Sequence, residues 1–245
     1  VEKTITSPEQ SIVIIGSGAA GIELAFAFRK KFSKSNIKPK ITIIGSAERF
    51  FPELSHRCHL SILKKCSAAN INVQFGQPVT KVSKNTVTLA TGITIATDCS
   101  LIVTGARPSD WLNSASICLT HDGYVQVNNA FQSVSDERVF AVGDIAKVRY
   151  QHRPRSGVFA VRAGPTLAKN LRLALNKSPL KHVSQQSRYL SLIMLDNNDV
   201  MAIWGRFFMS AKWLWPIKKW IDQRFISKFT KLPEMVQDNH RSIIL

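Results

Sequence analysis

The sequence predicts an α/β fold with a parallel sheet, and three observations support this prediction. Short runs of β-branched residues alternate with helical stretches up to about residue 105, which is the rhythm of βαβ units. A glycine-rich turn joins the first run to the first helix. Between residues 79 and 96, three short alternating runs indicate an antiparallel meander. The 245 residues, 44% of them hydrophobic, allow one large or two modest domains and exclude a disordered chain.

Periodicity and turn residues define the expected elements. In the first part we expect strands at 12–15, 41–44, 71–75 and 101–104, helices at 19–32 and 55–69, and meander strands at 79–82, 86–90 and 93–96. The segment 109–137 is rich in loop residues. After it we expect a strand at 139–142, a helix at 161–175, and strands at 189–195 and 200–204.

The charge is strongly positive, with 33 Lys and Arg against 16 Asp and Glu and a net charge of +17. Such a charge favours anionic partners: phosphorylated cofactors, nucleic acid or an acidic membrane surface. A non-enzymatic nucleic-acid-binding protein is a remote alternative, because no helix-turn-helix, zinc or single-strand-binding motif is present, and we expect no nucleic-acid partner. No stretch reaches the roughly 20 apolar residues of a membrane span.

The four cysteines are not arranged as a metal site or a disulfide framework. They show no CxxC spacing and no histidines at zinc-finger intervals, so we expect a reducing, cytoplasmic location and no bound metal. Two of them are eight residues apart on a predicted helix and are expected to be buried small hydrophobes rather than a redox pair. The cysteines are Cys58, Cys66, Cys99 and Cys118.

A GxGxxG motif follows the first strand and opens the first helix, and it predicts dinucleotide binding. The first glycine permits the tight turn, the second lets a pyrophosphate approach the backbone, and the third lets helix and strand pack closely. Glu23, in the first turns of the helix, is expected near the nicotinamide side. The alternative is a glycine-rich turn used only for packing. The expected binding residues of this turn are Gly16, Ser17, Gly18, Ala19, Ala20 and Gly21.

The second strand does not end in the acidic residue that usually binds the ribose 2′-hydroxyl of NAD. Ile44 is followed by Gly45, and the next charged residues are Glu48 and Arg49. Arg49 can meet a 2′-phosphate, so NADPH or a relaxed choice of cofactor is open. The alternative is that both side chains are ordinary solvated loop charges.

Two later motifs, at 103–108 (VTGARP) and 139–144 (VFAVGD), resemble the paired signatures of the FAD-dependent pyridine nucleotide-disulfide oxidoreductases. The resemblance implies that Gly105 and Ala106 mark the crossing from the NAD(P) domain to the FAD domain, and that Gly143 and Asp144 hold FAD. It also implies three parts: a Rossmann-like NAD(P)-binding domain over 1–108, the C-terminal half of a glutathione-reductase-like FAD domain over 109–183, and a C-terminal α+β segment with a Trp-rich basic helix over 184–245.

In that family a first FAD-binding glycine motif precedes the NAD(P) domain, and the resemblance implies that this chain is N-terminally truncated. We therefore expect the chain alone to hold FAD poorly. No CxxxxC pair is present, which favours the disulfide-free, NADH dehydrogenase-like branch. The implied reaction passes hydride from NAD(P)H to FAD and on to a second acceptor, a small molecule or a quinone. Because the flavin does this chemistry, we assign no catalytic acid, base or nucleophile.

A narrower resemblance is to the NADH dehydrogenase-like module fused to selenide, water dikinase. Residues 153–165 and the Trp-rich stretch 213–229 carry it, and 231–235 resembles the linker before the kinase. It implies a fused or associated kinase and an alternative role in selenium metabolism. It also implies that Gly157, Val158, Phe159 and Ala160 lie near the isoalloxazine. His152 is either a proton relay or a structural or exposed histidine.

The C-terminal stretch combines apolar residues at helical spacing with a basic margin, the pattern of an interfacial membrane helix. This pattern predicts peripheral membrane contact. The alternative, favoured because the fused relatives are soluble, is that the apolar face packs against the protein or a partner domain. The apolar residues are Trp213, Ile217, Trp220, Ile221, Phe225 and Phe229, and the basic residues are Lys218, Lys219, Arg224 and Lys228.

Overall fold

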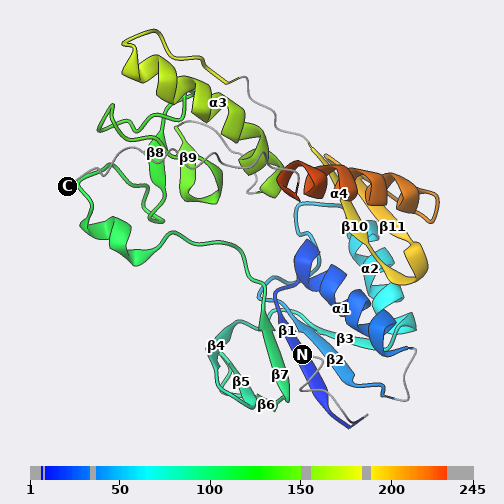
Figure 1. Cartoon of the computed structure of the whole chain (residues 1–245). Helices are drawn as coiled ribbons and strands as arrows, with labels where there is room; N and C mark the ends of the chain where they lie inside the picture. The colour runs from blue at the N-terminus through cyan, green and yellow to red at the C-terminus, as the bar shows by residue number, and fades with distance from the viewer. Residues whose placement is uncertain (1–6, 8, 34–36, 150–155, 184–188, 231–245) are drawn as a thin grey trace, which may run out of the picture.

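A four-stranded parallel sheet forms the centre of the first part of the protein. The computed structural model describes residues 7, 9–33, 37–149, 156–183 and 189–230 (Figure 1). The sheet has the strand order β3-β2-β1-β7, and every neighbouring pair is parallel. The predicted α/β fold with a parallel sheet is thus confirmed. The strands are β1 (Ser11–Ile15), β2 (Lys40–Ile44), β3 (Ile71–Gln74) and β7 (Cys99–Ile102).

Alternate residues of the sheet face two separate apolar layers. On one face, Ile12 and Ile14 of β1 pack with the helices α1 (Ala19–Phe32) and α2 (His56–Ala68). On the other face, Val13 and Ile15 pack with the meander β4–β6. Both faces are therefore covered, which agrees with the nearly continuous β-branched sequences of the central strands β1 and β2. The meander strands are β4 (Val79–Val82), β5 (Thr86–Leu89) and β6 (Thr94–Ala96).

A second, antiparallel sheet covers the outer side of helices α1 and α2. It has the order β10-β11-β12, and its buried residues belong to the same apolar cluster as the parallel sheet (Figure 1). Two ion pairs fix it: Lys65 of α2 with Asp199, and Lys218 of α4 with Glu23 of α1. The helices therefore lie between two sheets. The elements are β10 (Leu190–Met194), β11 (Val200–Trp204), β12 (Phe207–Ala211) and α4 (Leu214–Thr230).

The middle of the chain forms a smaller lobe around a separate apolar cluster. Helix α3 (Gly157–Leu175) packs on the parallel pair β8 (Val125–Val127) and β9 (Ala146–Val148). The buried amide of Asn170 connects α3 to segments that precede and follow it in the sequence. It donates to the carbonyls of Ala130 and Lys181 and accepts from the Lys181 N–H.

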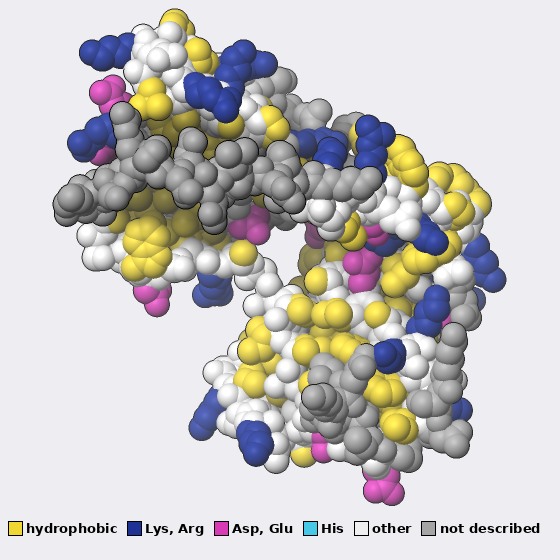
Figure 2. Space-filling model, in the orientation of Figure 1, with side chains coloured by type: hydrophobic (Ala, Val, Ile, Leu, Met, Phe, Trp, Pro, Cys, Tyr) yellow, Lys and Arg dark blue, Asp and Glu magenta, His cyan; other side chains and the backbone are white. Residues whose placement is uncertain are grey.

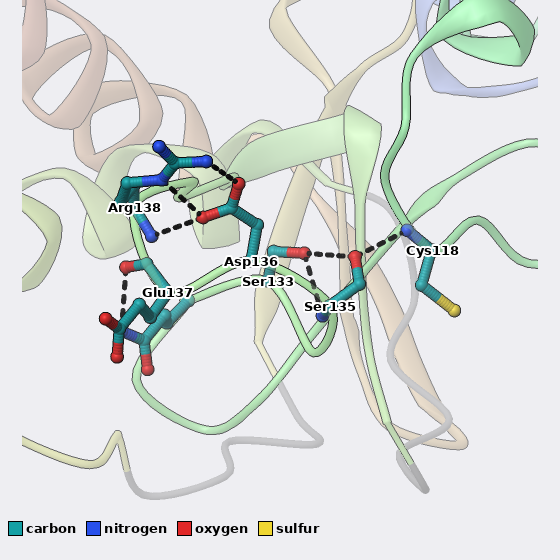
Figure 3. A network of polar contacts seen from close by, with 7 residues as sticks. Cys118, Ser133, Ser135, Asp136, Glu137 and Arg138 are labelled. Atoms are coloured by element: carbon teal, nitrogen blue, oxygen red, sulfur yellow. Dashed lines mark hydrogen bonds and ion pairs between the residues drawn. The ribbon is translucent and has the colours of Figure 1, made fainter.

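A polar network holds the loop that leads from β8 toward residue 143 (Figure 3). The Ser135 hydroxyl accepts from the Cys118 N–H at 2.7 Å and lies 3.2 Å from the Ser133 hydroxyl. Next to it, Arg138 donates from its guanidinium and its backbone N–H to the Asp136 carboxylate. The hydrogen bonds from the Arg138 side chain are the main cause of the lowered Asp136 pKa, which is about 2.

The structure corrects several expected elements in the second half of the chain. The expected strand at 139–142 is wrong, since only an isolated bridge between Phe140 and Gln132 forms there. Strands β8, β9 and β12 were not expected: β8 and β9 have only three residues each, and β12 has the sequence FFMSA, which shows no alternation of apolar and polar residues. Helix α3 begins four residues before its expected start, because the Ser156 hydroxyl accepts from the Val158 N–H and caps it.

None of the helices within the described residues is long and apolar enough to cross a membrane.

His59 on α2 gives the fold a pH-sensitive contact. Its Nδ1 accepts a hydrogen bond from the Phe50 N–H at 3.2 Å, and the residue is only 8% exposed. Burial lowers the pKa of His59 from its usual 6.5, and the charges of His56 and Arg49 lower it further. The neutral form is therefore the one that the fold accommodates.

We predict that stability falls as the pH falls below the ordinary histidine pKa, because the unfolded chain then binds a proton that His59 in the fold resists. The free energy of unfolding, measured by urea denaturation at about pH 7.5 and about pH 5.5, should decrease less in His59→Phe than in the wild type. Loss of the acceptor should also cost His59→Phe about 1 kcal/mol at the higher pH. The exposed His121→Phe is the matched control and should keep the wild-type pH dependence. An unchanged pH dependence in His59→Phe would contradict this assignment.

Candidate functional site: a cleft at the carboxyl edge of the parallel sheet

A cleft of about 970 Å³ opens where strands β1, β2 and β7 end. The carboxyl edge of a parallel sheet is where ligands bind in open α/β folds. The glycine turn forms its floor, and the segments after β2, β3 and β7 form its walls. A hairpin of the smaller lobe contributes the last two lining residues. The residues lining the cleft are Ile15, Gly16, Ser17, Gly18, Ile44, Ser46, Ala47, Gln77, Pro78, Val79, Val103, Thr104, Gly105, Ala106, Arg107, Asp122 and Tyr124.

The three glycines of the turn have three different surroundings. Gly16 has φ +127°, and a Cβ there would lie 2.4 Å from the Val103 carbonyl oxygen of the neighbouring strand segment. A Cβ on Gly21 would lie 1.9 Å from the Gly16 carbonyl oxygen, so helix and turn are in direct backbone contact. A Cβ on Gly18 would meet nothing within 4 Å. The first and third glycines thus serve close packing, while the second leaves open space on the cleft side.

The N-terminus of helix α1 points its free donors at this open space. Gly18 is the N-cap residue, with extended backbone angles of φ −78° and ψ −174°, and no side chain caps the helix. Its first turn also contains no acidic residue. Unsatisfied N–H groups and the positive end of the helix dipole attract an anion such as a phosphate. The shape and the polarity of the turn therefore fit a pyrophosphate.

The charged residues after β2 point away from the cleft. The Arg49 guanidinium donates to the carbonyls of Pro52, at 2.7 Å, and Leu54. Glu48 is exposed and its carboxylate lies beside Gly76. The uncharged Ser46 and Ala47 line the cleft instead. This favours the interpretation of Glu48 and Arg49 as loop charges over contact with a 2′-phosphate.

The segment that follows β7 forms the part of the cleft on the side of β1 away from β2. Gly105 and Ala106 line it, as does Arg107. Tyr124 is 3% exposed, and its hydroxyl donates to the Ala106 carbonyl at 3.1 Å, which fixes this segment against the smaller lobe. Asp122, beside Tyr124, pairs with Lys147 at 3.4 Å. One side chain of each charge, Arg107 and Asp122, thus lies in this part of the cleft.

The structure places Glu23 outside the cleft. Its carboxylate accepts a hydrogen bond from the Met194 N–H at 2.8 Å and pairs with Lys218 at 3.2 Å. Both partners belong to the C-terminal part of the chain. In this structure the Glu23 side chain therefore joins α1 to β10 and α4, and its expected role on the nicotinamide side stays a prediction.

The residues expected to hold FAD lie on the smaller lobe, apart from the cleft. Gly143 has φ +73°, and a Cβ there would lie 3.5 Å from Cβ of Ala160 in the first turn of α3. Asp144 follows with an exposed carboxylate. Phe159 is 5% exposed, with its ring centroid 5.2 Å from that of Tyr189. An open carboxylate beside a helix N-terminus fits a ribityl hydroxyl and a phosphate.

The other residues predicted to bind a cofactor fall into those that line the cleft and those at the starts of α1 and α3. Of the fourteen expected cofactor-binding residues, Gly16, Ser17, Gly18, Gly105 and Ala106 line the cleft. Ala19, Ala20 and Gly21 form the first turn of α1 behind it, and Gly157 and Val158 begin α3. His152 and residues 153–155 lie outside the described part of the chain.

Gln77, Asp122 and Tyr124 line the cleft although no motif indicated them. Gln77 follows the third parallel strand, and the carboxyl edge of the sheet was the one signal that pointed to it. The other two come from a hairpin far along the chain, which local patterns do not place.

The cysteines of α2 are buried and unsuited to redox chemistry in the fold. Burial raises the pKa of Cys58 to about 11 and that of Cys66 to about 12, so both stay protonated at neutral pH. The Cys58 sulfur lies 3.8 Å from the sulfur of Met201 in the apolar cluster. No group of three or more His, Cys, Asp or Glu suited to a metal ion occurs among the described residues.

The glycine turn yields a paired prediction. Gly18→Val should keep the fold, losing less than about 1 kcal/mol of stability, because its side chain enters open space. NADH affinity should fall about 10-fold or more because that space is where a phosphate would lie. Gly21→Ala, by contrast, should lose about 1–3 kcal/mol because its Cβ meets a backbone oxygen. Thermal unfolding and NADH titration measure the two effects. Wild-type NADH affinity in a folded Gly18→Val would contradict the assigned phosphate position.

Comparison with known proteins agrees with this geometry. The family model for pyridine nucleotide-disulphide oxidoreductases matches residues 2–164. The type II NADH:quinone oxidoreductase of Haemophilus influenzae is 22% identical over 209 residues, covering 80% of this chain and 47% of that protein. Oxidoreductase ptaL of Pestalotiopsis fici is 26% identical over 204 residues, covering 81% of this chain and 52% of its own length. The chain thus spans about half the length of these curated relatives.

Two solved structures have the same fold. NDH2 of Plasmodium falciparum, in complex with NADH, superposes with a TM-score of 0.74 at 12% identity, covering 89% of this chain and 62% of that one. The sulfide:quinone oxidoreductase of Aquifex aeolicus superposes with a TM-score of 0.69 at 15% identity, covering 89% and 58%. Since the family model matches well over half of the residues, this chain belongs to the pyridine nucleotide-disulphide oxidoreductase family.

Proposed function

We propose that this chain is the NAD(P)H-binding part of an FAD-dependent NAD(P)H oxidoreductase, in which hydride passes from NAD(P)H to FAD and on to a second acceptor. The observation that carries the proposal is the open space at Gly18, in front of the uncapped helix N-terminus, within a cleft of about 970 Å³. Family membership and the names of the relatives support the same reaction class.

The residues of the cleft would bind and orient the dinucleotide. The free N–H groups at the start of α1 would hold the pyrophosphate. The adenosine half would then lie toward Ser46 and Ala47, and the nicotinamide half toward Gly105 and Ala106, because these lining residues follow β2 and β7, which flank β1 on its two sides. Binding therefore orients the nicotinamide toward the side where the smaller lobe begins.

The smaller lobe would supply part of the FAD site. Asp144 would accept hydrogen bonds from hydroxyl groups, and the N-terminus of α3 would face a negatively polarised group. FAD held there would supply the redox chemistry, hydride uptake from the reduced nicotinamide and electron transfer to an acceptor. The acceptor is proposed to be a quinone or another small molecule, which the name of the Haemophilus influenzae relative supports.

The test is NADH titration followed by NADH oxidation with menadione as acceptor and FAD in excess. We expect NADH to bind with one site per chain, and oxidation to require added FAD. Asp144→Asn should lower the affinity for FAD by about 10-fold while leaving NADH affinity unchanged, because it removes a charge from the smaller lobe only. Glu137→Gln, a charge removed elsewhere on that lobe, is the matched control. Absence of NADH binding, or oxidation that does not depend on FAD, would overturn the proposal.

We further propose that α4 contacts the surface of an anionic membrane. Aromatic side chains in α4 and in the turn just before it are exposed: Trp220 is 59% and Phe229 58% accessible in the helix, and Trp213 is 60% accessible in the turn. Exposed Trp204 and Phe207 lie on the adjoining strands, and Figure 2 shows hydrophobic side chains beside Lys and Arg over this part of the molecule. Aromatic residues flanked by basic ones bind at the interface of bilayers that contain anionic lipids. Such contact would bring the protein close to a quinone acceptor.

Liposome co-sedimentation tests this contact. The chain should bind vesicles that contain about 30% phosphatidylserine, because their negative surface attracts basic side chains. It should be released as the salt concentration is raised, because salt screens this attraction. Trp220→Ala and Phe229→Ala together should weaken binding by about 10-fold, because interfacial affinity scales with buried apolar area. Trp111→Ala, on the other lobe and 64% exposed, is the control. If the wild-type chain stays in the supernatant, the membrane proposal fails, and the result favours packing of the apolar face of α4 against the protein or a partner domain.

We also propose that this chain is the NADH dehydrogenase-like module that is associated with selenide, water dikinase. Its support is the sequence of 153–165 and 213–229, the described parts of which form the start of α3 and most of α4. A kinase-like coding sequence after Leu245 would favour this assignment, and its absence from the gene and its neighbours would remove it.

A further inference from the structure

Gln77 is a lining residue of the cleft, and its buried side-chain oxygen lacks a hydrogen-bond partner. Among the described residues, Gln77 Oε1 and Arg29 Nε are the buried side-chain nitrogen and oxygen atoms without a partner. Gln77 lines the cleft, whereas Arg29 lies at the far end of α1 and donates from its other nitrogen to the Asn70 carbonyl. Buried polar atoms are nearly always paired, so an unpaired one at a cleft marks a place where a ligand can supply the missing partner.

The backbone holds Gln77 beside the end of β2. Its N–H donates to the Gly45 carbonyl at 3.0 Å, and the Gly76 N–H donates to the Ala47 carbonyl at 3.0 Å. Gly76 has φ +63°, and a Cβ there would lie 2.8 Å from the Glu48 carboxylate. The turn at Gly76 thus brings Gln77 to the cleft, while Glu48 lies beside this turn and does not line the cleft.

No charged group from the ends of β2 or β3 reaches the cleft within the described residues. The lining side chains there are Ser46, Ala47, Gln77, Pro78 and Val79. Gly45 occupies the position where an acid commonly binds the ribose 2′-hydroxyl, and a Cβ at that position would lie 2.3 Å from the Ser17 hydroxyl. The space for an acid is therefore taken by Ser17, and Gln77 has the longest polar side chain among the lining residues that follow β2 and β3.

We propose that Gln77 binds the adenosine ribose of the dinucleotide and makes the site tolerant of both NADH and NADPH. This inference rests on the proposed NAD(P)H-binding function. Turning the amide toward the cleft breaks no hydrogen bond of its oxygen, which then accepts from the 2′-hydroxyl of NADH. The amide nitrogen can instead donate to the 2′-phosphate of NADPH. A carboxylate in the same place would repel that phosphate.

The experiment measures equilibrium binding of NADH, NADPH, 5′-AMP and adenosine 2′,5′-bisphosphate to the 245-residue chain by calorimetry. In the wild type, the affinities for NADH and NADPH should agree within about 5-fold, as should those for the two adenosine nucleotides, because an amide serves either group. Gln77→Glu should weaken NADPH and the bisphosphate by about 10-fold or more relative to NADH and 5′-AMP. Gln77→Leu should weaken all four by about 2- to 10-fold. Gln223→Glu, the same change on exposed α4, is the matched control.

The outcomes separate this inference from the proposed function. If the folded wild type binds neither dinucleotide, the proposed function fails and the inference fails with it. If both dinucleotides bind and folded Gln77→Glu keeps the wild-type ratio of NADPH to NADH affinity, only the role of Gln77 is overturned. A wild type that discriminates between the two by about 100-fold also overturns the claimed tolerance. If Gln77→Glu does not fold, unchanged affinities in Gln77→Leu decide against the proposal.

Discussion

The direct backbone contact between helix α1 and the turn that precedes it is the constraint on which the site depends. With no side chain at Gly21, the helix approaches Gly16, whose carbonyl oxygen would lie 1.9 Å from a Cβ there. Gly16 in turn fits against the Val103 carbonyl of the neighbouring strand segment. These two contacts aim the helix N-terminus at the carboxyl edge of the sheet. The donors that would hold a phosphate are therefore placed by backbone packing, and no charged side chain is needed.

The opposite side of the same helix carries the C-terminal part of the chain. Ile193, Met201 and Ile203 of the antiparallel sheet complete the apolar cluster that also contains Ile22 and Phe26 of α1. Glu23, two residues after Gly21, pairs with Lys218 and accepts a hydrogen bond from the Met194 N–H. Helix α1 thus connects the cleft to α4, which carries the exposed side chains of Trp220 and Phe229.

The charge distribution explains why a chain of net charge +17 has a nearly neutral cleft. Arg49, the first basic residue after β2, donates to the carbonyls of Pro52 and Leu54. Glu48 lies beside Gly76. The pyrophosphate would thus be attracted by the helix terminus, while the adenosine end is left to uncharged groups. The excess positive charge lies elsewhere, much of it in the C-terminal part.

The sequence by itself determined the parallel sheet, its two helices and the meander, because β-branched runs and helical periods are long enough there to be distinguished. It also determined the glycine turn, and Gly16, Gly18 and Gly21 have surroundings that match the three roles expected for them. Patterns failed for β8 and β9, which have three residues each, and for the expected strand at 139–142.

Only the tertiary structure decided where individual side chains point. The sequence placed Glu23 near the nicotinamide, whereas its carboxylate lies on β10 and α4. It left Glu48 and Arg49 as candidates at the ribose, and no motif indicated Gln77, Asp122 or Tyr124, which line the cleft. These positions depend on contacts between segments far apart in the chain. Local sequence fixes the backbone period of an element, but the direction of a polar side chain depends on which distant donor or acceptor the fold brings within reach.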